Sequence, residues 1–72
     1  MNKEEFLKKL KETVCTSENL TEETEFGSLD EWDSLGVMSV ISMVEDNFNV
    51  SLDYAEIDKM KTVKDLMTKV GI

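Results

Sequence analysis

Apolar residues recur along this chain at the spacing of α-helices, most clearly between residues 34 and 48. There they occupy the i, i+3, i+4 and i+7 positions, which share one face of a helix. The apolar residues on this face are Val37, Val40, Ile41, Val44 and Phe48. We expect these side chains to form the buried stripe of a long central helix.

An earlier helix is predicted over residues 3–16, because apolar residues again recur on one face. These residues are Phe6, Leu7, Leu10 and Val14. Asn2, followed three residues later by Glu5, is typical of a helix N-terminus, where the two side chains cap free backbone groups.

Two more helices are predicted in the C-terminal part of the chain. Asp53 with Glu56, and Thr62 with Asp65, have the spacing of N-terminal caps. The apolar residues of the short third helix are Tyr54, Ile57 and Met60. Those of the fourth helix are Val63, Leu66, Met67 and Val70, and Gly71 is expected to end it.

Residues 17–33 lack helical periodicity and predict a long loop, since they combine Gly27 with several Ser, Thr and Asn residues. The loop also contains large apolar residues, which are Leu20, Phe26, Leu29 and Trp32. Side chains of this kind are costly to leave in water, so we expect the loop to lie pinned across the helices.

Together these elements predict one small all-α domain over residues 1–72. It is a four-helix bundle with three longer helices, a short third helix, and a long loop between the first two. The composition agrees, because the chain has no proline, three glycines and 40% hydrophobic residues.

Charge is distributed unevenly. No lysine or arginine occurs between Lys11 and Lys59, and thirteen acidic residues lie in that span. With a net charge of −8, the chain is expected to repel nucleic acid and anionic membranes. The acidic middle has two interpretations: a solvated surface that keeps a small protein soluble, or a surface that attracts basic partner proteins.

Several kinds of chemistry are excluded by residue content. The chain has no histidine and one cysteine, so it offers neither a Cys/His zinc site nor a Ser-His-Asp arrangement. A small calcium-binding protein is disfavoured, because no stretch has the ligand spacing of a calcium loop. Catalysis by this chain alone is therefore not expected. Cys15 follows Val14 and is interpreted as a small core residue.

Neither a membrane span of ~20 apolar residues nor a signal-peptide core is evident. The single cysteine fits a reducing compartment, and we expect a cytoplasmic monomer that does not insert into membranes.

The stretch EWDSLGVMSV, residues 31–40, offers one hydroxyl for chemistry. Asp33 and Ser34 are both favoured helix caps, and either could be present for that reason alone. Ser34 could equally bear a phosphate ester, because a helix N-terminus stabilises negative charge. Leu35 and Met38 lie off the apolar stripe. They are either core residues of a wide buried face or an exposed apolar ledge for a partner or ligand.

These residues resemble the acyl carrier protein family. The tripeptide D-S-L at 33–35 opens an amphipathic helix, E-D-N-F at 45–48 closes it, and Thr62-Val63 begins the last helix. The resemblance covers nearly the whole chain and implies a free-standing carrier.

The resemblance also implies a cofactor and a set of roles. Ser34 is expected to be esterified by 4'-phosphopantetheine, donated from coenzyme A by a separate phosphopantetheinyl transferase. Acyl groups would then be held as thioesters on this arm, with Asp33 and Leu35 as motif neighbours of the serine. The implied partner surface consists of Leu35, Met38, Glu45 and Asp46. The candidates for lining the acyl chain are Val40, Val44, Ile57 and Met60.

The partners implied are fatty-acid or related biosynthetic enzymes with basic docking surfaces, which transfer acyl groups or elongate them. A specialised polyketide, glycan-modifying or amino-acyl pathway is the alternative, as is an acidic helical adaptor without a prosthetic group. Gly36, Ser39 and Ser42 replace the acids that fatty-acid carriers often have after D-S-L. Trp32 and Gly36 are more typical of specialised carriers, whereas Glu31-Trp32, in place of a glycine pair, counts against an amino-acid cargo.

Overall fold

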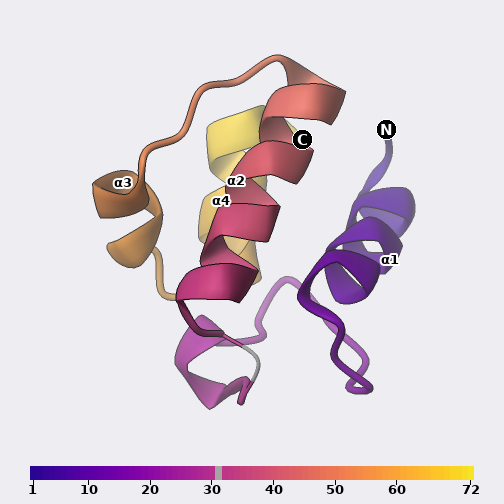
Figure 1. Ribbon diagram of the computed structural model, residues 1–72. Helices are drawn as coiled ribbons and strands as arrows, with labels where there is room; N and C mark the ends of the chain where they lie inside the picture. Colours follow the sequence, from indigo (N-terminus) through magenta and orange to yellow (C-terminus); the bar gives the residue numbers. More distant parts are fainter. Residues whose placement is uncertain (31) are drawn as a thin grey trace.

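A computed structural model describes residues 1–30 and 32–72, which form an all-α bundle (Figure 1). The helices are α1 (Lys3–Val14), α2 (Ser34–Phe48), α3 (Tyr54–Asp58) and α4 (Val63–Val70), with one 3₁₀ turn, η1 (Phe26–Ser28). This confirms the predicted bundle of three longer helices and a short third one. Glu31, one of the residues used to interpret the cargo, lies outside the described residues.

The core is built from apolar side chains of all four helices. In Figure 1, α2 lies between α1 and α3, and it packs against both. The fully buried side chains are Phe6, Leu10, Phe26, Val40, Val44, Ile57, Val63, Leu66 and Met67. At the C-terminal end of α2, the Phe6 and Phe48 rings pack at an interplanar angle of 63°, with 5.6 Å between ring centroids.

The buried face of α2 differs from the predicted stripe in two respects. Val37, Val40 and Val44 are buried as expected, whereas Ile41 and Phe48 are only partly buried against the core. Met43, which lies outside the predicted stripe, is buried. The buried face is wider than a single stripe because α2 has neighbours on two sides.

The first helix is shorter than predicted. It ends at Val14, and Cys15 adopts the left-handed conformation with φ of 60°. There the backbone N–H of Cys15 donates to the carbonyl of Glu12 over 3.2 Å, and that of Thr16 donates to Lys11 over 3.3 Å. The interpretation of Cys15 as a core residue is wrong: the left-handed turn leaves its side chain exposed and buries Thr16 instead.

The predicted caps of the outer helices are confirmed. The Asn2 side chain accepts a hydrogen bond from the Glu5 backbone N–H over 2.8 Å. Thr62 and Asp65 form a reciprocal capping box at the start of α4. Hydrogen bonds from the backbone N–H groups of Lys61 and Thr62 hold the pKa of the Asp65 carboxyl below its ordinary value of 3.8.

The long loop is pinned to the bundle, as predicted. Its apolar residues Leu20, Phe26 and Leu29 are buried, and the Trp32 ring stacks on Phe26 with 4.1 Å between centroids. Backbone hydrogen bonds fix the loop to Lys61, just before α4, and to the first two residues of α4. They run from Phe26 to Lys61, from Val63 to Thr24 and from Lys64 to Glu22, over 2.9–3.0 Å.

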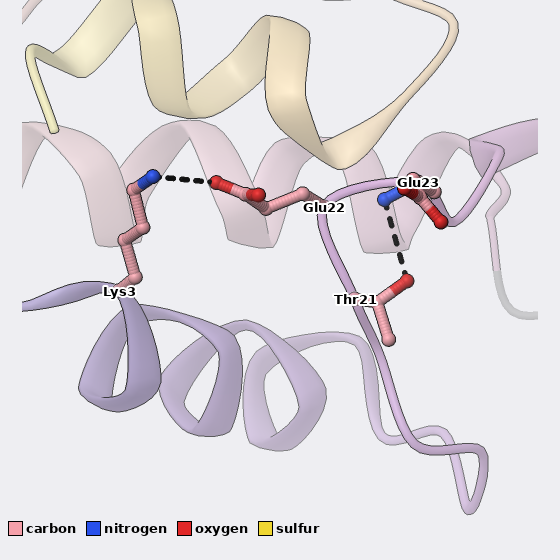
Figure 2. A network of polar contacts seen from close by, with 4 residues as sticks. All are labelled: Lys3, Thr21, Glu22 and Glu23. Carbon is pink, nitrogen blue, oxygen red and sulfur yellow. Dashed lines mark hydrogen bonds and ion pairs between the residues drawn. The ribbon is translucent and has the colours of Figure 1, made fainter.

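An ion pair also joins this loop to α1. Figure 2 shows the Lys3 ammonium 2.9 Å from the Glu22 carboxylate, and beside it the Thr21 hydroxyl accepts from the Glu23 backbone N–H. The hydrogen bond from Lys3 lowers the pKa of Glu22. Both side chains of the pair remain well exposed, so the buried apolar residues contribute more to holding the loop.

Candidate functional site at the start of α2

Asp33 and Ser34 occupy different positions at the start of α2. Asp33 is the N-cap, and its side-chain Oδ1 accepts a hydrogen bond from the Gly36 backbone N–H over 2.9 Å. Ser34 is the first residue of the helix, and its side chain is exposed. The structure therefore assigns the cap to Asp33, and the Ser34 hydroxyl is free of that task.

The electrostatic setting of Ser34 suits an anionic group. At the N-terminus of a 15-residue helix, backbone N–H groups of the first turn and the helix dipole both favour negative charge. No lysine or arginine occurs anywhere in α2. A phosphate esterified to Ser34 would therefore be stabilised mainly by the helix itself.

Leu35 and Met38 are exposed, by 76% and 60% of their surface. Of the two interpretations drawn from the sequence for these residues, burial as core residues is wrong, and exposure as an apolar ledge is right. The reason is that the neighbouring helices of α2 cover the sides carrying Val37, Val40 and Val44, leaving these two side chains uncovered.

The ledge continues into an acidic surface along the same face of α2. Glu45 follows Met38 by seven residues, and Asp46 follows Leu35 by eleven, which are close to whole numbers of helical turns. Both acids are exposed. We call these four residues the outer face of α2: it is apolar beside Ser34 and acidic toward the C-terminal end.

Within α2, no charged residue occurs between Ser34 and Glu45, although the exposed Asp33 carboxylate lies just before Ser34. Gly36 and Ser39 are partly buried, and the Ser39 hydroxyl donates to the Leu35 carbonyl over 3.0 Å. The Ser39 hydroxyl is thus used within the helix, whereas that of Ser34 is not.

The four candidates for lining an acyl chain differ in accessibility. Val40, Val44 and Ile57 are fully buried in the closed bundle. Met60 is partly buried and lines an open hollow of about 530 Å³, together with Phe26 and Trp32. A chain that reached the first three side chains would have to part α2 from α3, so their role stays a prediction.

Sequence reasoning assigned no site role to Tyr54. The structure places its hydroxyl 3.5 Å from Ser34 Oγ, although 20 residues separate the two. The Asp53 cap indicated that Tyr54 begins a helix, and Asp53 does accept a hydrogen bond from the Glu56 backbone N–H over 2.8 Å. That the helix would face Ser34 depends on how α3 packs on α2, which no local pattern reveals.

In the described part of the chain, no group of three or more His, Cys, Asp or Glu side chains is arranged to hold a metal ion. None of the helices there has both the length and the apolar character needed to cross a membrane.

Comparison with known proteins gave one match. The family model described as a phosphopantetheine attachment site matches residues 5–70. No curated protein and no solved structure matches the chain.

Proposed function

This chain belongs to the phosphopantetheine attachment site family, and on that basis we propose that Ser34 is the residue to which 4'-phosphopantetheine is attached. The observation that carries the proposal is the division of roles at the start of α2. Because Asp33 caps the helix, the exposed Ser34 hydroxyl is available for esterification at a position that stabilises a phosphate.

When bound, the group supplies a thiol that can hold an acyl chain as a thioester. The residues of this chain hold the arm at Ser34 and present it beside the outer face of α2. The chain has no histidine, and the Asp33 carboxylate beside Ser34 caps the helix by accepting from the Gly36 backbone N–H. We therefore propose a carrier of acyl intermediates that is not itself a catalyst.

Carrier domains of this kind are modified by phosphopantetheinyl transferases and interact with other enzymes. We propose the outer face of α2 as the surface that meets them. Leu35 and Met38 would be covered by an apolar patch of the partner, while Glu45 and Asp46 would steer a basic docking surface toward Ser34. Exposed charges of this kind increase the association rate more than the affinity, which suits brief encounters with successive enzymes.

Fatty-acid or related biosynthesis is the pathway that we propose, and a specialised polyketide or glycan-modifying route is the second candidate. The neutral surface formed by Gly36 and Ser39 favours the specialised route, because it limits charge recognition near the arm.

Loading with an acyl group tests the carrier role. The protein should be incubated with a broad-specificity phosphopantetheinyl transferase and an acyl-coenzyme A, and then treated with hydroxylamine. A carrier gains one acyl-phosphopantetheine group and loses only the acyl part to hydroxylamine. An acidic adaptor without a prosthetic group would keep its original mass throughout.

A further inference from the structure

Tyr54 is placed to contact whatever is attached to Ser34. It is the first residue of α3, and the Asp53 cap fixes the start of that helix. Since α3 packs beside α2 (Figure 1), the Tyr54 hydroxyl lies 3.5 Å from Ser34 Oγ. Tyr54 is 46% exposed, so a group on Ser34 can reach its hydroxyl without displacing the core.

The 3.5 Å separation is long for a hydrogen bond between two hydroxyls, which usually spans 2.5–3.0 Å. The contact therefore contributes little in the unmodified protein. The oxygens of a phosphate esterified to Ser34 would lie one phosphorus atom beyond Oγ, so a donor at this distance is better placed for them than for the serine oxygen.

The negative charge of the phosphate makes the Tyr54 hydroxyl more important as a hydrogen-bond donor. A phosphodiester is anionic, yet neither α2 nor the segment from residue 49 to 58 contains a lysine or arginine. The nearest carboxylate in sequence, Asp33, is engaged with the Gly36 backbone N–H. Tyr54 offers an O–H donor, and a hydrogen bond to an ionised acceptor is about twice as strong as one between neutral groups.

We propose that the Tyr54 hydroxyl donates a hydrogen bond to a phosphate oxygen of the arm on Ser34 and so directs the base of the arm toward α3. The inference rests on the proposed attachment at Ser34. Tyr54 acts as a positioning residue: it forms and breaks no covalent bond. With the arm held on the α3 side, Leu35 and Met38 stay uncovered for partner enzymes.

Nuclear magnetic resonance of the arm-bearing protein tests this role. Wild type and Tyr54→Phe are each converted with coenzyme A and a transferase, and intact mass first confirms one added group. The chain has one tyrosine, so a tyrosine-specific ¹³C label reports on Tyr54 alone. We expect arm attachment to shift the ring signals of Tyr54 in wild type. We also expect the ³¹P signal of Tyr54→Phe to lie closer than that of wild type to the ³¹P signal of the proteolysed protein, in which the fold is lost.

Three outcomes would overturn the proposal. If the ring signals of wild type do not move on attachment, Tyr54 does not bind the phosphate. The same conclusion follows if folded Tyr54→Phe carries the arm with the ³¹P shift and line width of wild type. If wild type accepts no arm, the attachment at Ser34 fails and this inference fails with it. The ring measurement uses wild type alone, so it decides the matter even if the variant does not fold.

Discussion

At the start of α2, two adjacent polar residues have separate roles. Asp33 has extended backbone geometry, with φ of −115° and ψ of −174°, and its carboxylate caps the helix. Ser34 already belongs to the helix and presents its hydroxyl outward. The same residue that stabilises the helix thereby leaves its neighbour free for modification.

Replacing Asp33 with Ala should lower the free energy of unfolding by about 1 kcal/mol, because the Gly36 backbone N–H loses its acceptor. Asp33→Asn keeps an acceptor oxygen and should retain most of the stability. Ser34→Ala should change stability much less than Asp33→Ala does. Urea denaturation of the three variants measures these differences, and a larger loss for Ser34→Ala would place the cap on the wrong residue.

The lowered pKa of Asp65 predicts that the stability of the fold depends on pH. Its pKa is below 3.8 in the folded chain because the N–H groups of Lys61 and Thr62 donate to it. The stability from these bonds is therefore present above the unfolded pKa and lost as the pH falls through the folded pKa. Thermal midpoints measured downward from pH 5 should fall less steeply for Asp65→Asn than for wild type. Parallel profiles for the two proteins would contradict the proposed role of this carboxylate.

At the level of the helices, the sequence predicted what local chemistry determines. Asn2, Asp53 and the Thr62–Asp65 pair cap the helices as expected, because a cap needs only residues three positions apart. The start of α2 and the pinned loop were also predicted. The exposure of Cys15 was not, since it follows from a left-handed turn that the sequence does not signal with glycine.

Features that depend on packing between helices could not be predicted. Whether Leu35 and Met38 are covered depends on where α1 and α3 lie against α2. The approach of Tyr54 to Ser34 depends on the same packing. The D-S-L motif therefore identified Ser34, whereas the residues that surround it in space could be identified only from the structure.

The outer face of α2 makes a prediction about partners. Leu35→Ser and Met38→Ser should leave stability nearly unchanged, because both side chains are exposed. They should raise the KM of a phosphopantetheinyl transferase for this protein, since the apolar contact is lost. Glu4→Gln, at an exposed position of α1, is the control. Equal KM values for all of these proteins would show that the transferase docks elsewhere.

In the whole molecule, the positive charges lie at the two ends of the chain and most of the negative charges lie in the middle. Ion pairs connect these regions, between Lys3 and Glu22 over 2.9 Å and between Lys69 and Glu56 over 3.0 Å. Both pairs are exposed and contribute little, while thirteen acids between Lys11 and Lys59 repel one another. Repulsion should therefore dominate the response to salt.

Added salt is expected to raise the thermal midpoint. Screening acts over about 10 Å at 0.1 M ionic strength and weakens repulsion across the acidic middle. Melts followed by circular dichroism in increasing sodium chloride, and separately with a divalent cation, measure the effect. A midpoint that stays constant or falls with salt would mean that the two ion pairs outweigh the repulsion.

The central claim is that Ser34 bears the arm, and intact mass after incubation with coenzyme A and a broad-specificity transferase tests it most directly. Ser39→Ala is the matched control, because Ser39 lies on the same helix but its hydroxyl donates to the Leu35 carbonyl. Wild type and Ser39→Ala should each gain one phosphopantetheine group, and Ser34→Ala should gain none. Uptake by Ser34→Ala equal to that of wild type, or no uptake by wild type, would contradict the claim.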